Sequence, residues 1–233
     1  MAQFVKHKRC PECASVGKDL AGDNLAVYND GSTYCFSCGY SEGSGKFVPV
    51  TRNKISLPFL TNDFPPANLA YLRQYLTDEE IVRWFKFSPG MNRHVFAWQE
   101  GDDLFYEARS VIEGKPKSLQ YGDKPFPILR NHDDMSNTLV LVEDILSAIV
   151  CSRKYSAVPL FGSALRTEWL SKIAISGFDK VIVWLDKDKT SVATAMARKI
   201  SVVKPARVVQ TPLDPKEMGD SLEDVCEMPV LVW

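Results

Sequence analysis

The fold is decided by residues 181–188, which read VIVWLDKD. A run of apolar residues that ends in carboxylates is typical of a strand buried on both faces, as in a parallel sheet. Residues 139–144, LVLVED, show the same arrangement earlier in the chain. A stretch with helical spacing of its apolar residues follows each run. Because strands and helices alternate in this way, the sequence predicts an α/β domain with a parallel sheet and right-handed crossovers.

Two more short strands and three helices complete the predicted domain, which spans residues 138–225. We expect strands at 157–160 and 207–210, and helices at 144–154, at 166–175 and from 190 to about 203. The apolar residues of the last helix recur three or four positions apart, which places them on one helix face.

Acidic residues follow three of these strands, and they are Glu143, Asp144, Asp186, Asp188 and Asp214. The carboxyl ends of parallel strands meet at one edge of a sheet, where ligands of such folds bind. Crowded carboxylates repel one another unless a cation is present, and oxygen ligands suit magnesium or manganese. A solvated acidic loop is the alternative. Three acidic strand ends favour the metal site over that alternative.

Near the N-terminus, four cysteines form two pairs, with two residues between the members of each pair. The pairs are Cys10 with Cys13 and Cys35 with Cys38. This spacing lets both sulfurs of a pair face one ion, and two pairs complete the tetrahedral coordination of zinc. Two disulfides or a redox CxxC are the alternatives. A reducing compartment disfavours disulfides, and neither pair lies in a thioredoxin-like βαβ pattern.

The segment between the cysteine pairs supports a zinc ribbon over residues 1–42. Residues 25–28 and 33–36 read as strands, and residues 29–32, NDGS, form a strong hairpin turn signal. Gly39 follows the second pair, where a tight turn needs a residue without a Cβ atom. A unit of about 40 residues has too small a core to fold unaided, so zinc should stabilise it.

Residues 43–66 are predicted to be a linker, because they are rich first in glycine and serine and then in proline. Residues 67–137 are predicted to form an α+β unit. A capping-box pattern from Thr77 to Glu80 starts a helix that residues 88–90 should end. Strands are then expected around 95–98 and 104–112, followed by a basic loop at 115–122.

Composition excludes several classes of protein. The 233 residues are 45% apolar and 24% charged, as in ordinary globular proteins. With no apolar run of 18 residues and no apolar stretch behind the N-terminus, we expect no membrane span, no secretory signal and a cytoplasmic protein. There is no P-loop pattern. Lys and Arg number 28 against 29 Asp and Glu, so a nucleic-acid role must rest on motifs rather than on net charge.

Taken in order, these motifs resemble the DnaG-type primases. The strand ending in Glu143, the DxD of Asp186 and Asp188 and the later Asp214 are similar to the Toprim fold of primases, topoisomerases and related nucleases. A four-cysteine ribbon ahead of that fold resembles the primase zinc-binding domain. Residues 95–122, VFAWQEGDDLFYEARSVIEGKPKSLQYG, are similar to the segment between them. The resemblance covers about residues 8–40 and 70–225, and the compact size is similar to that of tailed-phage primases.

The resemblance implies a multi-domain α+β protein that makes short RNA primers on single-stranded DNA from ribonucleoside triphosphates during DNA replication. It implies a zinc ribbon, an N-terminal subdomain of the RNA polymerase domain at 67–137 and a Toprim domain at 138–225. The implied partners are the DNA template and a separate replicative helicase and DNA polymerase. The implied location is the host cytoplasm if a phage encodes the chain.

The resemblance also assigns roles to individual residues. Glu143, Asp186 and Asp188 would be catalytic and hold magnesium or manganese, and Asp214 would be a further ligand, directly or through water. Arg109 and Lys117 would contact phosphates, the alternative being that both are solvated surface charges.

One motif departs from the family pattern. The usual Toprim start is Glu-Gly-x-x-Asp, but Asp144 stands at the glycine and Ser147 at the aspartate. This departure puts the support of the first loop in doubt, and Asp144 is the candidate to supply part of the missing charge. Two other functions stay open. They are a Toprim nuclease and a non-enzymatic zinc-ribbon protein that binds single-stranded DNA, and the presence of Glu143, Asp186 and Asp188 together disfavours the second.

Overall fold

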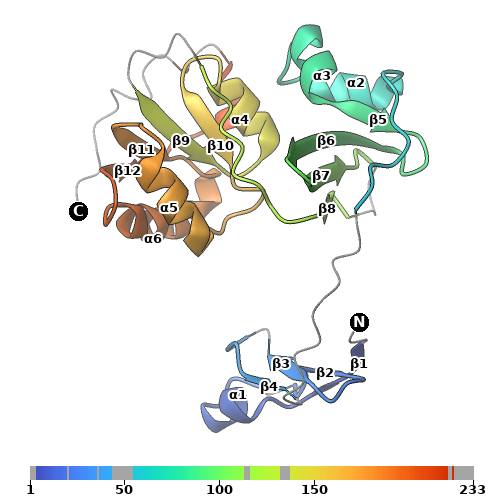
Figure 1. The fold of residues 1–233 in the computed structure, drawn as a ribbon, viewed down its shortest axis with the longest axis vertical. Helices are drawn as coiled ribbons and strands as arrows, with labels where there is room; N and C mark the ends of the chain where they lie inside the picture. Colours follow the sequence, from blue (N-terminus) through green and yellow to red (C-terminus); the bar gives the residue numbers. More distant parts are fainter. Residues whose placement is uncertain are drawn as a thin grey trace. The chain divides into compact units, whose positions relative to one another are not determined.

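The computed structural model describes residues 4–19, 21–35, 37–43, 55–112, 116–131, 137–219 and 222. The chain divides into two compact units, Met1–Lys54 and Ile55–Trp233 (Figure 1). Each unit has its own hydrophobic core, so each is described by itself. None of the described helices combines the length and the apolar composition needed to cross a lipid bilayer.

The N-terminal unit is a four-stranded antiparallel sheet with one short helix. Its strands lie in the order β1 (Phe4–Lys8), β2 (Leu25–Tyr28), β3 (Thr33–Cys35) and β4 (Ser41–Glu42), and α1 covers Pro11–Ser15. The predicted hairpin is β2 and β3. In its turn, Asp30 accepts a hydrogen bond from the Ser32 N–H and Gly31 has a φ of 80°. The sequence does not predict β1, because all of its residues are exposed and show no alternation of apolar and polar side chains.

A parallel sheet forms the C-terminal part of the second unit. Its strand order is β10 (Ser156–Pro159), β9 (Thr138–Val142), β11 (Lys180–Val183) and β12 (Ala206–Val208). All three pairs of neighbouring strands are parallel. The chain runs from β9 out to β10 and then crosses to β11 on the other side of β9. The strand order therefore reverses between β9 and β11, and such a reversal opens a crevice at the carboxyl ends of the strands.

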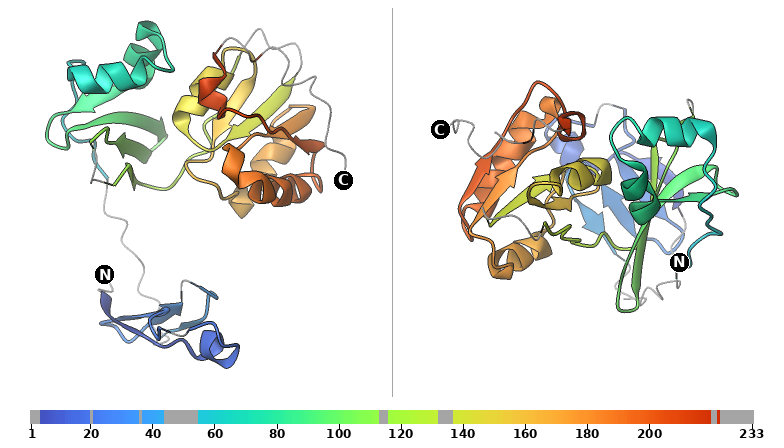
Figure 2. Two further views of the ribbon diagram at one scale, coloured as in Figure 1. Left: turned by 180° about the vertical axis from the view of Figure 1, so that it is seen from behind. Right: turned by 90° about the horizontal axis from the view of Figure 1, so that it is seen from above.

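Helices cover both faces of this sheet. Helix α4 (Ile145–Cys151) lies on one face, and α5 (Thr167–Ile175) and α6 (Thr190–Ile200) lie on the other (Figure 2). Alternate residues of β9 serve the two faces: Val140 and Val142 pack toward α4, and Leu139 and Leu141 pack toward α5 and α6. Every residue of β9 is buried. The predicted parallel sheet with alternating strands and helices is confirmed.

The first part of the second unit is a separate antiparallel sheet with two helices. The strands follow the order β5 (Lys86–Ser88), β6 (Arg93–Glu100), β7 (Asp103–Arg109) and β8 (Ser118–Tyr121). Helices α2 (Pro66–Leu72) and α3 (Asp78–Trp84) precede them. The predicted capping box starts α3, because the Thr77 side chain accepts the Glu80 N–H and the Glu80 side chain accepts the Thr77 N–H.

Two predictions for this sheet are wrong in detail. Helix α3 ends at Trp84, and residues 86–88, which the sequence places in the helix, form β5. The predicted basic loop contains β8, which pairs with β7. Short strands with mixed polarity give no periodic signal, so only the neighbouring strand reveals them. Gly122 ends β8 with a φ of 90°, and a Cβ atom there would lie 2.2 Å from the Leu104 carbonyl oxygen.

Residues 55–65, which precede α2, contain no helix or regular strand, yet they contact the antiparallel sheet. Ile55 and Leu60 pack against the cluster around Val95, and Thr61 forms an isolated bridge with Phe87. The remainder of the predicted linker, residues 44–54, lies outside the described residues. The domain boundaries at 1–42, 43–66, 67–137 and 138–225 stay predictions.

One hydrophobic core is shared by the antiparallel sheet and the α4 face of the parallel sheet. It contains Phe85, Phe96 and Phe105 from the first and Val140 and Ile149 from the second. The joint is built around Phe161, the second residue after β10. Its ring lies 5.8 Å from that of Phe96 and 4.6 Å from that of Phe105, and its carbonyl accepts hydrogen bonds from the side chains of Gln120 and Lys124. The shared core holds the two sheets in one compact unit.

Candidate functional site

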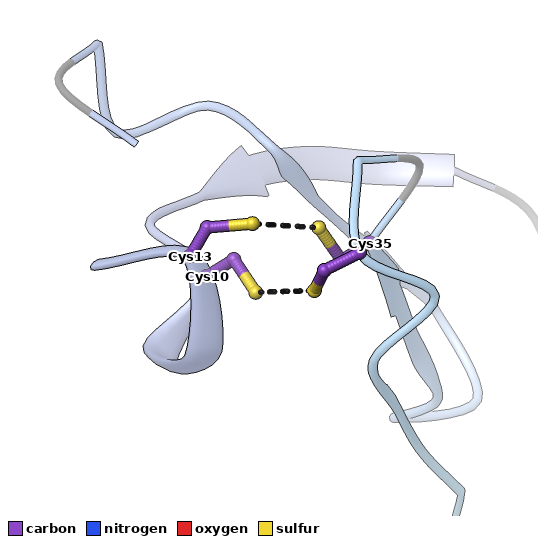
Figure 3. Close-up of side chains that lie close together, drawn as sticks. Cys10, Cys13 and Cys35 are labelled. Atoms are coloured by element: carbon purple, nitrogen blue, oxygen red, sulfur yellow. Dashed lines mark hydrogen bonds between the residues drawn. The ribbon is translucent and has the colours of Figure 1, made fainter. Parts of the chain in front are cut away.

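The four cysteines of the N-terminal unit converge on one point. Their sulfur atoms all lie within 4.8 Å of one another. The Cys10 and Cys38 sulfurs are 3.6 Å apart, and those of Cys13 and Cys35 are 3.7 Å apart. Figure 3 shows the side chains of Cys10, Cys13 and Cys35 pointing toward one another. With Zn–S bonds of about 2.3 Å, the edge of a tetrahedral zinc site is about 3.8 Å, so this four-cysteine cluster fits zinc.

Backbone hydrogen bonds position the two halves of the cluster. Cys10 is the N-cap of α1 and Cys13 lies within that helix, while Cys35 ends β3. Beyond the second pair, the Gly39 N–H donates to the Cys35 carbonyl at 2.9 Å with a φ of 76°. Gly39 therefore makes the tight turn that the sequence predicts. None of the described cysteines forms a disulfide.

Asp19 supports the cluster, and the sequence does not reveal it as a functional residue. Its buried carboxylate accepts the Cys10 N–H at 2.6 Å, the Gly22 N–H at 2.8 Å and the Asp23 N–H at 3.1 Å. Burial by itself would raise the pKa of Asp19, but these backbone hydrogen bonds lower it overall. The sequence carries one signal for this contact, the Asp-x-x-Gly spacing of Asp19 and Gly22, since aspartate often accepts hydrogen bonds from the backbone of a turn that follows it.

The predicted carboxylates of the second unit meet where the strand order reverses. Glu143 and Asp144 directly follow β9, and Asp186 lies just beyond β11. The two strand ends stay paired up to this point, because the Trp184 N–H donates to the Leu141 carbonyl at 2.9 Å. We call Glu143, Asp144, Asp186, Asp188 and Asp214 the acidic edge. These residues follow the carboxyl ends of the strands, which is where ligands bind in sheets of this kind.

Two oxygen atoms of the acidic edge are buried without a hydrogen-bond partner, Oε2 of Glu143 and Oδ1 of Asp186. Burial, followed by the charge of Asp186, raises the pKa of Glu143. Burial also raises the pKa of Asp186. Buried carboxylate oxygens that lack donors and crowd one another are suited to bind a hard divalent cation such as magnesium or manganese.

Asp188 is less closely held than Glu143 and Asp186. It lies in the 3₁₀ turn η1 (Lys187–Lys189), is exposed and pairs with Lys189. Among the described residues, the carboxylates of the acidic edge are not gathered as tightly as the four cysteine sulfurs. The ligand roles of Glu143, Asp186, Asp188 and Asp214 therefore stay predictions.

Asp144 has two structural partners in place of the glycine of the usual motif. Its Oδ1 accepts the Ser147 N–H at 2.8 Å and so caps α4, and its Oδ2 accepts Nη1 of Arg109 at 3.0 Å. Burial would raise the pKa of Asp144, but Arg109 and Lys216 lower it overall. The side chain of Ser147 has a buried hydroxyl without a partner and does not replace the missing aspartate.

The two predicted phosphate contacts lie at the paired ends of β7 and β8 but differ in exposure. Arg109 is 6% exposed and its guanidinium is paired with Asp144. Lys117 is exposed and directly precedes Ser118, the residue that pairs with Arg109 across the two strands. Arg109 is thus no solvated surface charge, and contact of either residue with a phosphate stays a prediction.

Lys216 is a further residue of this site that the sequence does not single out. Its Nζ lies 3.1 Å from Oδ2 of Asp214 and 3.9 Å from Oδ2 of both Asp144 and Asp186, and the residue is only 9% exposed. Asp214 starts the 3₁₀ turn η2 (Pro215–Glu217) and forms a capping box with Glu217. A lysine next to an aspartate normally reads as a surface pair, so only the folded sheet shows that Lys216 reaches three strand ends.

Comparison with known proteins adds little to these observations. No protein-family model and no curated protein sequence matches the chain. Among solved structures, the chain is similar to the primase fragment of the bacteriophage T7 primase-helicase protein. The two share 15% sequence identity with a TM-score of 0.45, and the match covers 97% of each chain. A likeness this distant does not identify a family, so function is inferred from the residues of the four-cysteine cluster and the acidic edge.

Proposed function

We propose that this protein is a DNA primase, which synthesises short RNA primers on single-stranded DNA. The observation that carries the proposal is the pair of unpartnered oxygens of Glu143 and Asp186 at the point where the strand order reverses. In a parallel α/β sheet this point is where ligands bind. The four-cysteine cluster in the same chain and the order of the sequence motifs support a primase over other enzymes with such an edge.

In this proposal, Glu143, Asp186 and Asp188 hold magnesium or manganese, which supplies positive charge to the phosphates of the incoming nucleotide. The reaction joins the 3′-oxygen of one ribonucleotide to the α-phosphorus of the next and releases pyrophosphate. Lys117 is exposed and contacts the triphosphate. Arg109 is fixed by Asp144 at the acidic edge, so its charge is in place before substrate binds.

The N-terminal unit is proposed to bind zinc and to read the template. Zinc completes the four-cysteine cluster and stabilises a unit whose core is small. Tyr34 is 43% exposed on β3, and exposed aromatic rings of this kind stack on the bases of single-stranded DNA. A replicative helicase and a DNA polymerase, each a separate protein, are the proposed partners.

The proposal is tested by incubating the full chain, loaded with zinc, with single-stranded DNA of random sequence, four labelled ribonucleotides and magnesium. We expect short RNA products that require the DNA. Asp186→Asn is the matched control, because it keeps the size of the side chain and removes its charge, and it should abolish synthesis. Cutting of the DNA without ribonucleotide incorporation would instead identify the nuclease. DNA binding with neither reaction would identify the non-enzymatic protein.

A further inference from the structure

Lys216 places a positive charge inside the acidic edge. Its ammonium group lies within 4 Å of carboxylates that follow three different strands, Asp144 after β9, Asp186 after β11 and Asp214 after β12. It is largely buried, so solvent screens these interactions only weakly.

The segment that carries Lys216 is held firmly against the end of β11. The Trp184 indole N–H donates to Oγ1 of Thr211 at 2.9 Å, and that hydroxyl donates to the Leu213 carbonyl at 2.5 Å. Pro215 is the first residue of η2 and is buried. These contacts fix the backbone that carries Lys216 beside the acidic edge.

Charge balance at the acidic edge indicates how many metal ions it accepts. Five carboxylates make up the edge, and three cations pair with it: Arg109 with Asp144, Lys189 with Asp188, and Lys216 most closely with Asp214. Two negative charges remain. They belong to Glu143 and Asp186, the same residues whose buried oxygens have no partner. One divalent ion neutralises this remainder.

The two oxygens of Asp186 differ in their surroundings. Oδ2 lies near Lys216, while Oδ1 is buried and unpartnered. Asp214, by contrast, is engaged with Lys216 and with the capping box of η2. Asp186 thus has one oxygen free to bind a metal ion, whereas the carboxylate of Asp214 already interacts with Lys216 and with the backbone of η2.

We propose that Lys216 is a built-in cation that stands where a second divalent ion would bind. The acidic edge then takes a single divalent ion, which Glu143 and Asp186 bind together with the exposed Asp188 of the proposed function, and Asp214 is a partner of Lys216 rather than a metal ligand. This inference rests on the proposed function, in which Glu143 and Asp186 are metal ligands. It assigns Lys216 a positioning role, since it acts through the carboxylates.

The test counts manganese ions bound to the zinc-loaded full chain in the absence of nucleotide and DNA, using the electron paramagnetic resonance signal of free Mn²⁺. We expect one Mn²⁺ per wild-type chain and one for Lys216→Arg, which keeps the charge. Lys216→Gln should bind two, because the second ion takes the place of the ammonium group. A wild-type chain that binds two Mn²⁺, or a Lys216→Gln chain that still binds one, overturns the inference.

Asp214→Asn provides an independent test should Lys216→Gln fail to fold. If Asp214 is a partner of Lys216, this variant should keep its Mn²⁺ affinity within about threefold of the wild type; loss of a ligand or of its support typically costs about tenfold or more. A loss of tenfold or more would overturn the inference. In the Lys216→Gln background, Asp214→Asn should remove the second ion.

The outcome also separates this inference from the proposed function. A chain that binds one Mn²⁺ but makes no primers refutes the primase and leaves the role of Lys216 standing. A wild-type chain that makes primers but binds two Mn²⁺ supports the primase and refutes the proposed role of Lys216.

Discussion

Asp144 shows how one side chain changes the support of a loop. A glycine at this position offers only conformational freedom, whereas the carboxylate caps α4 through the Ser147 N–H and pairs with Arg109. Both members of this pair are largely buried, with side chains 7% and 14% exposed. The carboxylate of Asp144 therefore connects α4 to β7, and Glu143 and Asp186 are the carboxylates left to bind a metal ion.

Asp144→Ala should be strongly destabilising. It removes the cap of α4 and leaves the Arg109 guanidinium buried without its partner, and breaking a buried ion pair in this way costs about 3–5 kcal/mol. The free energy of unfolding in urea measures the loss. Asp188→Ala, an exposed residue of the same edge, is the control and should leave stability nearly unchanged. Equal stability of Asp144→Ala and the wild type would contradict a structural role for Asp144.

At the scale of helices and strands, the sequence predicts the elements that are buried on both faces. The apolar runs of β9 and β11 can be recognised as buried strands from the sequence alone. The capping box of Thr77 and Glu80 likewise marks the start of α3. Strands β5 and β8 are short and mixed in polarity, so they depend on a pairing partner that the sequence does not name.

The same distinction applies to the candidate sites. The cysteine pairs and the carboxylates at strand ends are recognisable because their spacing in the chain reflects their chemistry. Lys216 is not recognisable, since its role comes from distances set by the fold between residues that lie apart in the sequence. Asp19 has a local signal for a turn, but its hydrogen bond to the Cys10 N–H is visible only in the fold.

An ion pair links α3 to the turn after α4. The Arg153 guanidinium donates to both Glu80 oxygens, at 2.9 and 2.7 Å, and also to the Tyr75 carbonyl at 2.8 Å. Burial would raise the pKa of Glu80, but Arg153 and the Thr77 N–H lower it overall. This ion pair connects α3, which precedes the antiparallel sheet, to the turn after α4, which covers the parallel sheet.

Glu80→Gln should lower the free energy of unfolding by about 1 kcal/mol at pH 7, a value discounted for the partial exposure of the pair. The amide can still complete the capping box, so the loss reports the ion pair alone. Because the pKa of Glu80 is lowered by folding, its stabilisation is full above the unfolded pKa of about 4.3 and is lost as the pH falls through the folded pKa. Urea unfolding should therefore show the difference between variant and wild type shrinking below about pH 4. A difference independent of pH would contradict this assignment.

At the scale of the whole molecule, the chain combines two units that differ in what stabilises them. The N-terminal unit has a small core made largely of the cysteines themselves, Cys10, Cys13 and Cys35 with Leu25. The second unit has two extensive cores and needs no metal to bury its apolar side chains. Loss of zinc should therefore affect only one of them.

Removal of zinc by a strong chelator should unfold residues 4–43 and leave the second unit folded. The physical reason is that the ion no longer joins the two cysteine pairs, while the remaining core is too small to hold the sheet. Hydrogen exchange followed by mass spectrometry checks this, with rapid exchange expected in β2 and β3 and unchanged protection in β9 and β11. Loss of protection in β9 after chelation would show that the two units are not independent.

The position of Phe161 has a consequence for how such a chain can be inherited. Its ring packs against Phe96 and Phe105, and its carbonyl accepts hydrogen bonds from Gln120 and Lys124, so the segment after β10 is matched to the antiparallel sheet of this chain. A recombination event that exchanged either sheet for a counterpart from another gene would bring together surfaces that had not evolved in contact. The two sheets of the second unit should therefore pass between genomes as one block, whereas the zinc-binding unit can be exchanged as a cassette.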